Sequence, residues 1–337
     1  MARRTQIWRW VSFAMALALV AVVVYLGWVG FQGSSLFGEQ SRGGDCRTPA
    51  SAFGWDYQAV NYDIAADRAL DAYADRENCP SSGEPAGAAL TTDDGVPIAG
   101  WYVAAEAGRG ATAPTVVLAH AEGKNKSAML EWAETLHADY NLVFFDFRNS
   151  GQSGGSVTTM GVEEMRDLRA VLDWLESAKH PASVAVLGVS MGAAAAIDEA
   201  AADPRVAAVI ADSPYATLAN ALQARLEKDG YPLSLPGAWS ILLGGLLRTG
   251  VDTSAGDPLQ TIDHYGSRPL LIVAAGSDRA VGAGDAVALR DRASEGGAAV
   301  ELESCAGAAH AEAMRTCPTE YHGWLLGFLG QALNGGR

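Results

Sequence analysis

Residues 183–196 read SVAVLGVSMGAAAA: an apolar run, then Gly188-Val189-Ser190-Met191-Gly192, then a stretch of small residues. This order predicts a strand, a sharp turn and a helix. Glycines suit the positions on either side of such a turn, because neighbouring strand and helix backbone comes too close for a side chain. The turn presents a serine hydroxyl at a helix N-terminus, where the helix dipole and free N–H groups favour a developing negative charge. We therefore interpret Ser190 as a candidate nucleophile held between Gly188 and Gly192.

The turn belongs to a longer alternation of apolar runs and helical segments. The runs lie at 115–119, 142–145, 184–187, 206–211 and 269–274, with predicted helices between most of them at 127–137, 162–177 and 191–202. Such alternation predicts an α/β fold with a mostly parallel, doubly wound sheet. A turn at Asp94-Gly95 between two strand-like segments, 90–93 and 97–104, predicts an entry hairpin.

The alternation is interrupted between residues 213 and 265, which include apolar segments at 218–226 and 239–247. An insertion here would cover the carboxyl ends of the strands. We expect a helical lid at about 213–265 that shapes an apolar pocket. Plain surface helices are the alternative interpretation.

The N-terminus contains a long uncharged segment at residues 10–31. At 1.5 Å per helical residue it covers about the 30 Å hydrocarbon thickness of a bilayer. Arg3, Arg4 and Arg9 precede it, so the positive-inside rule predicts a cytoplasmic N-terminus and a catalytic domain outside the cytoplasm of a single-pass membrane protein. A cleaved signal peptide, which would make the protein secreted, is the alternative.

These features divide the chain into four predicted parts. They are a cytoplasmic N-terminus at 1–9, a transmembrane signal anchor at 10–31, a linker and N-terminal extension at 32–88 with a helix at about 64–76, and one large α/β domain at 89–334.

The composition is that of a folded, acidic protein. Of its 337 residues 49% are hydrophobic and 19% are charged, which predicts a packed core. Without the three N-terminal arginines, the rest of the chain has 21 basic and 39 acidic residues, which is a net charge of −18. Such a surface repels phosphate backbones, so we expect no nucleic-acid partner.

The chain has four cysteines, which fit an exported domain. An even number of cysteines agrees with an oxidising compartment, and pairing of neighbours, which would give two local bridges, is one of three possible connectivities. Free buried thiols are the alternative. The spacings are not those of a metal site, and we expect no metal or organic cofactor. The candidates are Cys46, Cys79, Cys305 and Cys317.

A serine nucleophile needs a base to take its proton and an acid to orient that base. Asp278 follows the apolar run 269–274 within Gly276-Ser277-Asp278, at the end of a predicted strand. His310 follows the next apolar run in a loop of small residues. We predict that Asp278 is the orienting acid and His310 the base, in the chain order serine, acid, histidine. If Cys305 and Cys317 pair, their bridge closes the loop that carries His310.

Other acids and histidines fit these roles less well. Asp285 falls within a predicted helix and His322 within the C-terminal helical pattern, while His137 and His180 are expected at the surface. His120, directly after a predicted strand, is interpreted as a structural side chain that bonds its own loop.

A developing oxyanion also needs hydrogen-bond donors. One is the N–H of Met191, the residue after the nucleophile. The second is expected from the loop after residues 115–119, and we assign it to the N–H of Glu122, with that of Ala121 as the near alternative.

Together these residues resemble the α/β-hydrolase superfamily, and more narrowly the membrane-anchored or exported bacterial serine hydrolases grouped as BEM46-like and serine-aminopeptidase-like. The similarity runs through His120-Ala121, residues 146–153, 188–192 and 211–215, Gly276-Ser277-Asp278 and 307–310. The resemblance implies the same catalytic roles for Ser190, Asp278 and His310. With these roles, the leading hypothesis is an acyl-enzyme mechanism on a small-molecule or acyl ester substrate.

The superfamily does not fix the substrate. A carboxylesterase-like acyl hydrolase is the leading interpretation. A serine exopeptidase is the second, with Glu227 or Asp229 near the lid as a carboxylate that could hold a peptide terminus. A membrane-tethered binding protein without turnover is the third.

Overall fold

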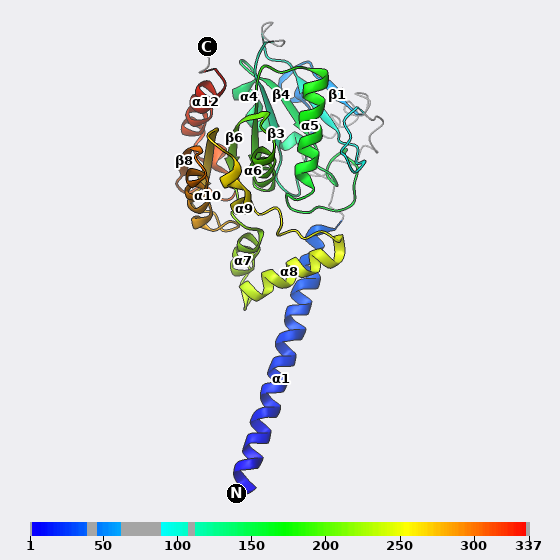
Figure 1. Ribbon diagram of the computed structural model, residues 1–337, viewed down its shortest axis with the longest axis vertical. Coiled ribbons are helices and arrows are strands. Elements are labelled where there is room, and N and C mark those ends of the chain that lie inside the picture. Colours follow the sequence, from blue (N-terminus) through cyan, green and yellow to red (C-terminus); the bar gives the residue numbers. More distant parts are fainter. Residues whose placement is uncertain (1, 39–45, 62–88, 107–111, 335–337) are drawn as a thin grey trace.

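The computed structural model describes residues 2–38, 46–61, 89–106 and 112–334. Its centre is an eight-stranded sheet in the order β1-β2-β4-β3-β5-β6-β7-β8 (Figure 1). Six strands run parallel, and two short strands pair antiparallel at one edge. The predicted α/β class is therefore confirmed. The antiparallel strands are β1 (Gln58–Val60) and β2 (Gly100–Val103); the parallel ones are β3 (Thr115–Ala119), β4 (Asn141–Phe145), β5 (Val184–Val189), β6 (Val206–Asp212), β7 (Pro269–Ala275) and β8 (Ala299–Cys305).

The sheet is covered on both faces. Alternate side chains of β3 enter opposite cores: Val117 lies in one and Val116 in the other, as the two-residue period of a strand requires. Helices α5 (Glu164–Ala178), α6 (Met191–Ala202) and α10 (Ala283–Glu295) complete the first core, while α4 (Leu130–Leu136) and α12 (Pro318–Asn334) complete the second. Because each face is covered, the central strands are continuous apolar runs.

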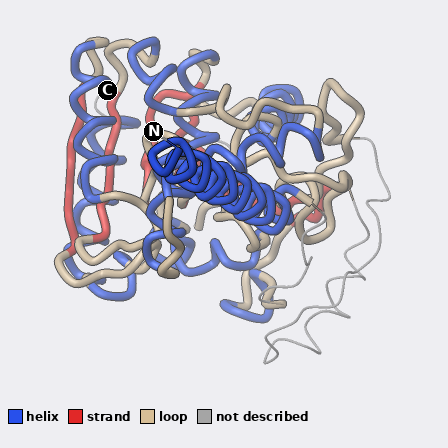
Figure 2. Tube along the Cα trace, turned by 90° about the horizontal axis from the view of Figure 1, so that it is seen from below, coloured by secondary structure: helices blue, strands red, loops and turns tan. Residues whose placement is uncertain are grey.

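The N-terminal segment is one long helix, α1 (Ala2–Gly33), followed by the 3-10 turn η1 (Ser34–Phe37). The stretch Trp8–Phe37 is long and apolar enough to cross a membrane, with a mean hydropathy of 2.3. In Figure 1 α1 projects from the body as a stalk, and Figure 2, seen from below, shows it in front of the body.

The first residues of the predicted linker are docked on the body. Phe37 is fully buried, its carbonyl accepts from the Thr158 N–H at 3.2 Å, and the Gly38 carbonyl accepts from Asn149 Nδ2 at 2.9 Å. Residues 34–38 therefore do not form a free tether. The predicted helix at 64–76 lies outside the described residues.

The interruption predicted at 213–265 is helical. It holds α7 (Leu218–Lys228), α8 (Ser234–Thr249), α9 (Pro258–Thr261) and the turn η3 (Ile262–His264). Helix α8 packs on α7 and crosses α1 where the stalk meets the body (Figure 1). The remaining short elements are α2 (Pro49–Phe53), η2 (Lys126–Met129) and α11 (Ala313–Thr316).

Candidate active site

Ser190 lies on the turn between β5 and α6, with φ 54° and ψ −113°. Positive φ is a strained conformation for a residue with a side chain. The two flanking glycines make it possible, because a Cβ on Gly188 would collide with the Gly192 backbone and one on Gly192 with the Ala119 carbonyl. The Ser190 N–H donates to the Asp212 carbonyl at 2.8 Å, which ties the turn to β6. The predicted strand, turn and helix are therefore all present.

The structure brings the three predicted catalytic side chains into one hydrogen-bonded chain. His310 Nε2 lies 2.8 Å from Ser190 Oγ, and His310 Nδ1 lies 2.7 Å from Asp278 Oδ2. Asp278 follows β7 and His310 follows β8, and the Ser277 N–H donates to the Ala308 carbonyl at 2.8 Å, so the two loops are joined directly. The histidine is in hydrogen-bond reach of both the serine and the acid, which is the arrangement that nucleophilic catalysis requires.

The environment of Asp278 keeps its carboxyl ionised. Burial alone would raise the pKa of Asp278, but the hydrogen bond and charge of His310 and the N–H groups of Val281 and Ala280 bring that pKa below its ordinary value. Those two N–H groups donate to Asp278 Oδ1 at 2.9 and 2.7 Å. One oxygen is thus fixed by backbone and the other is left for the imidazole.

The residues judged less suitable lie elsewhere. Asp285 accepts from the Ala216 N–H at 3.0 Å and so anchors the base of the lid region to α10, and His322 lies in α12. His137 was expected at the surface, and that expectation is wrong. Its ring is buried, stacks on Trp55 with centroids 3.8 Å apart and bonds the Ala104 carbonyl through Nε2.

The expected oxyanion donors lie on two segments beside the serine. Met191 is the first residue of α6, where no preceding helical turn supplies an acceptor for its N–H. The other segment follows β3 and is held by His120, as predicted: Nε2 accepts from the Phe147 N–H at 3.0 Å, so Nδ1 carries the proton donated to the Ala121 carbonyl at 2.8 Å. Burial lowers the pKa of His120, which keeps the ring neutral in this role.

The side chain of Glu122, on the same segment, is half-buried. Burial raises the pKa of the Glu122 carboxyl, against the attraction of Arg225, His310 and Lys124. Arg225 belongs to the lid helix α7. The influence of Arg225 and His310 on the Glu122 carboxyl was not predicted from the sequence, which pointed only to the Glu122 N–H. No group of three or more metal-ligating side chains occurs within the residues that the structure describes.

Comparison with known proteins identifies this architecture. The model of the alpha/beta hydrolase fold family matches residues 114–295, more than half of the chain. The chain belongs to the α/β-hydrolase fold family. The finer grouping suggested by the sequence stays a prediction.

Curated relatives of this α/β-hydrolase chain are uncharacterized. A Mycobacterium tuberculosis protein is 33% identical over 144 residues, covering 41% of this chain and 50% of that protein. A Bacillus subtilis protein is 32% identical over 187 residues, covering 53% and 58% respectively. The chain thus spans about half the length of the curated relatives it matches.

Solved structures share the fold at low identity. The Pyrococcus furiosus esterase Pf2001 has a TM-score of 0.64 and 23% identity, covering 85% of this chain and 96% of that one. Est1E from Butyrivibrio proteoclasticus, solved with ferulic acid, has a TM-score of 0.54 and 17% identity over 71% of this chain and 98% of that one. The acylaminoacyl peptidase of Pyrococcus horikoshii has a TM-score of 0.55 and 16% identity, covering 70% of this chain and 39% of that one. At these identities the likeness shows the fold alone.

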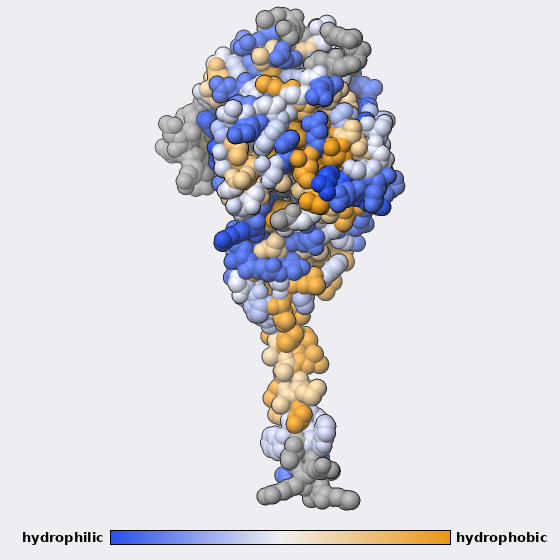
Figure 3. All heavy atoms as spheres, turned by 90° about the vertical axis from the view of Figure 1, so that its left-hand side faces the viewer, coloured by the Kyte–Doolittle hydropathy of each residue, from blue (hydrophilic) through white to orange (hydrophobic). Residues whose placement is uncertain are grey.

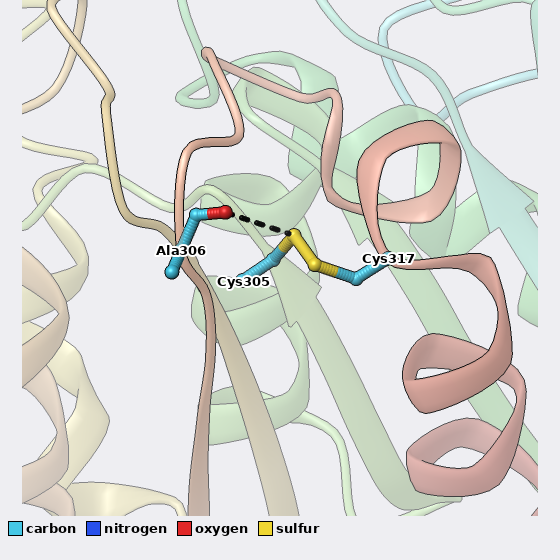
Figure 4. Close-up of a disulfide and its surroundings, with 3 residues drawn as sticks. All are labelled: Cys305, Ala306 and Cys317. Atoms are coloured by element: carbon cyan, nitrogen blue, oxygen red, sulfur yellow. Dashed lines mark hydrogen bonds between the residues drawn. A yellow bond between two sulfur atoms is a disulfide. The ribbon is translucent and has the colours of Figure 1, made fainter.

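A disulfide closes the histidine loop of this α/β-hydrolase domain. Cys305, at the end of β8, is bonded to Cys317, just before α12, with 12 residues of separation and 6.0 Å between Cα atoms (Figure 4). Of the connectivities that the sequence left open, the structure has the one that closes the loop around His310. Of the other pair, Cys46 is buried and Cys79 lies outside the described residues.

A buried polar group behind the site was missed by the sequence analysis. Asp212, fully buried at the end of β6, accepts from Tyr321 OH at 2.8 Å and from Ser213 Oγ at 2.9 Å. Trp132 Nε1 donates to the same tyrosine oxygen at 2.9 Å, and Ser213 Oγ accepts from the Ala311 N–H, next to His310. The hydrogen bonds among Asp212, Tyr321 and Ser213 therefore help to hold the loop that carries His310. An acid placed directly after a buried apolar run was the signal that could have pointed to it.

Burial also perturbs this acid. It raises the pKa of Asp212 to about 6, although the hydrogen bonds from Tyr321 and Ser213 act against the rise. The Asp212 carboxylate hydrogen-bonds Ser213 and Tyr321 and not the catalytic side chains, so its role is to position the loop rather than to react.

Proposed function

We propose that the protein is a membrane-anchored serine hydrolase that cleaves carboxylic esters through an acyl-enzyme on Ser190. The observation that carries the proposal is the continuous hydrogen-bonded chain from Ser190 Oγ through both nitrogens of His310 to Asp278. The fold family and the esterases among the similar structures support the same class of reaction.

In the proposed mechanism Ser190 Oγ attacks the ester carbonyl carbon while His310 Nε2 takes the hydroxyl proton. Asp278 holds the ring so that Nε2 faces the serine and stabilises the imidazolium that forms. The tetrahedral intermediate collapses, the C–O bond to the alcohol breaks, and His310 returns the proton to the departing alkoxide. Water then attacks the acyl-enzyme with His310 again acting as base, which releases the carboxylic acid and restores Ser190.

The negative oxygen of each tetrahedral intermediate needs fixed donors. The proposal gives this role to the N–H of Met191 and to that of Glu122, with Ala121 as the alternative. The dipole of α6 adds to their effect, because its N-terminus begins directly after Ser190.

Anchoring and orientation are part of the proposal. The α1 stalk, the arginines at its start and the positive-inside rule favour a single-pass protein with its catalytic domain outside the cytoplasm. The Cys305–Cys317 bridge fits an oxidising compartment. A cleaved segment would instead give a secreted enzyme.

An exopeptidase is the second candidate, favoured by Glu122 on the loop after β3, whose first residue His120 lies against Gly192. A carboxylate on this loop is a group that could bind the α-amino terminus of a peptide. The sequence suggested Glu227 or Asp229 for this role. Glu227 is exposed on α7 and accepts from Gln223 and Ser234, and Asp229 is exposed directly after α7.

The test uses the full chain in detergent micelles with p-nitrophenyl esters from acetate to laurate and with aminoacyl p-nitroanilides. We expect ester turnover that disappears in Ser190→Ala, while Ser304→Ala, an exposed serine on β8, retains it. Anilide cleavage without ester cleavage would favour the peptidase. No turnover by folded protein would favour the non-catalytic binding protein.

A further inference from the structure

Helix α8 exposes an apolar face. Leu235, Trp239, Leu243 and Leu247 follow one another at four-residue intervals, and Leu246 lies beside them. Such spacing places side chains along one side of a helix. Their exposed fractions run from 41% for Leu246 to 80% for Leu247. A contiguous strip of large apolar side chains on a soluble surface marks an interaction site.

The strip is continuous with α1. A Cβ on Gly30 would lie 2.5 Å from the Ser240 carbonyl oxygen, and one on Gly244 would lie 2.7 Å from the Gly30 carbonyl oxygen, so the two backbones touch where the helices cross. Small residues at a crossing are what close helix packing in membranes requires. Figure 3 shows the apolar colour of the stalk continuing onto the base of the body.

The crossing lies at the level where a bilayer would end. The uncharged part of α1 starts at Trp10, and twenty residues at 1.5 Å each reach Gly30, about the 30 Å thickness of the hydrocarbon core. If the charged end of α1 lies at one surface, Gly30 and therefore α8 lie at the other. The helix α8 is then at the membrane surface and not in bulk water.

Aromatic and basic side chains at this level suit a lipid interface. Trp28 stacks on Tyr231, with ring centroids 6.3 Å apart, and Tyr25 OH donates to the Pro232 carbonyl at 2.7 Å. Tryptophan and tyrosine favour the interface between hydrocarbon and headgroups. Arg248, exposed at the end of α8, hydrogen-bonds Ser34 and has no carboxylate partner within the described part of the chain.

Two hollows connect this level with the body. One of ≈ 630 Å³ lies between α1 and α8 and is lined by Leu26, Phe31 and Leu243 among others. A second of ≈ 270 Å³ lies between α1, α7 and α8 and includes Leu222 and Arg225. Arg225 belongs to α7, which follows β6 at the same edge of the sheet where β5 ends before Ser190. The second hollow therefore lies between the stalk and the lid helix that follows this edge of the sheet.

We propose that α8 lies in the outer surface of the bilayer, with its apolar face among the lipids, and that the site takes its acyl ester from the membrane through the opening between α1 and the lid helices. The occupant of the apolar face is the lipid bilayer. The substrate class is then a membrane-dissolved ester with long acyl chains. This inference rests on the proposed anchoring and esterase function.

Depth-dependent quenching tests the position of α8. The full chain is reconstituted into phosphatidylcholine vesicles with a nitrobenzoxadiazole probe on Leu247→Cys, Val20→Cys or Gln331→Cys. Val20 is exposed in the middle of α1, and Gln331 is exposed at the end of the chain that lies farthest from the stalk (Figure 1). Lipids with doxyl groups at shallow or deep positions are added to the vesicles.

We expect deep doxyl lipid to quench the probe at residue 20, shallow doxyl lipid to quench the probe at residue 247, and neither to quench the probe at 331. Quenching at 20 but not at 247 overturns the membrane seating of α8. A probe at 247 that is shielded from water yet not quenched indicates protein contact, such as a second copy, and also overturns it. Absence of quenching at residue 20 overturns the anchoring and the inference together.

A paired rate measurement tests the substrate class. The full chain in vesicles is given dioleoylglycerol in the bilayer or p-nitrophenyl butyrate in the water, and Leu247→Asp is compared with Gln331→Asp. We expect the ratio of the diacylglycerol rate to the butyrate rate to fall about tenfold in Leu247→Asp and to stay unchanged in Gln331→Asp, because a carboxylate is unfavourable among lipids. A ratio unchanged in Leu247→Asp overturns the membrane route while the esterase function stands. Turnover of neither ester by the unsubstituted chain overturns the proposed function, and the quenching result still reports the position of α8.

Discussion

Removal of the Cys305–Cys317 bridge is expected to lower both the stability of the fold and the activity of the site, and the two losses can be measured separately. The bridge joins the end of β8 to the residue before α12, and His310 lies on the loop that it closes (Figure 4). Without it, the loop is still held by the Ser277–Ala308 hydrogen bond and by Ser213. We therefore expect a protein that folds but is less stable and less active.

The size of the stability loss follows from the loop length. Closing 12 residues is worth about 3 kcal/mol of loop-closure entropy in the unfolded chain. In a domain of this size about 1 kcal/mol shifts Tm by about 2–4 °C, so the loss corresponds to about 6–12 °C. For activity, a displacement of the base by about 1 Å costs up to about a hundredfold in kcat, with a smaller effect on KM.

The assay compares the double variant Cys305→Ala/Cys317→Ala with the unsubstituted chain and with Ser304→Ala, the exposed neighbour on β8. The double variant avoids a reductant, which would act on every disulfide. Thermal unfolding gives Tm, and p-nitrophenyl butyrate hydrolysis gives kcat and KM. A Tm within about 2 °C of the parent together with an unchanged kcat would refute the reasoning, since the bridge would then hold neither the fold nor His310.

Three further substitutions probe the site. Asp278→Asn is expected to lower kcat about ten-thousandfold with little change in Tm, because the imidazole loses its orienting acid; an active variant would mean that another acid serves. Gly192→Ala is expected to destabilise by about 1–3 kcal/mol and to reduce activity, because the new Cβ meets the Ala119 carbonyl, whereas Gly323→Ala, with open space around it, should not destabilise. Asp212→Asn is expected to flatten the dependence of Tm on pH. The folded-state pKa of about 6 lies above the ordinary 3.8, so the stability that this acid contributes is fully present below about pH 4 and is lost as pH rises through 6, a difference of about 3 kcal/mol. Equal pH slopes for parent and variant would contradict that assignment.

The elements closest to Ser190 were predictable because local rules determine them. The alanine-rich segment 191–202 forms α6 with the predicted bounds, and the glycine positions follow from backbone contacts that any such turn makes. The segment predicted as a helix at 127–137 is instead the 3-10 turn η2, which Asn125 caps by accepting from the Ser127 N–H, followed by α4. Strand β1 was missed because three residues carry too little periodicity to recognise.

Features that depend on contacts between distant residues could not be predicted from the sequence. The apolar segment 239–247 was predicted to belong to a lid that shapes an apolar pocket, and nothing local indicates that α8 crosses α1, more than 200 residues earlier in the chain. Likewise His137 is buried where Trp55 from the N-terminal extension stacks on its ring. Asp212 gains its role through Tyr321 of the last helix. Each of these contacts is set by tertiary packing and not by local propensity.

Covalent labelling of Ser190 tests the central claim most directly. The folded full chain is treated with a fluorophosphonate, its intact mass is measured and the labelled peptide is mapped, alongside Ser190→Ala and His310→Ala. The account predicts one label per chain, located on Ser190, no label in Ser190→Ala and much slower labelling in His310→Ala. Failure of folded protein to react, or ester hydrolysis that persists in Ser190→Ala, would contradict it.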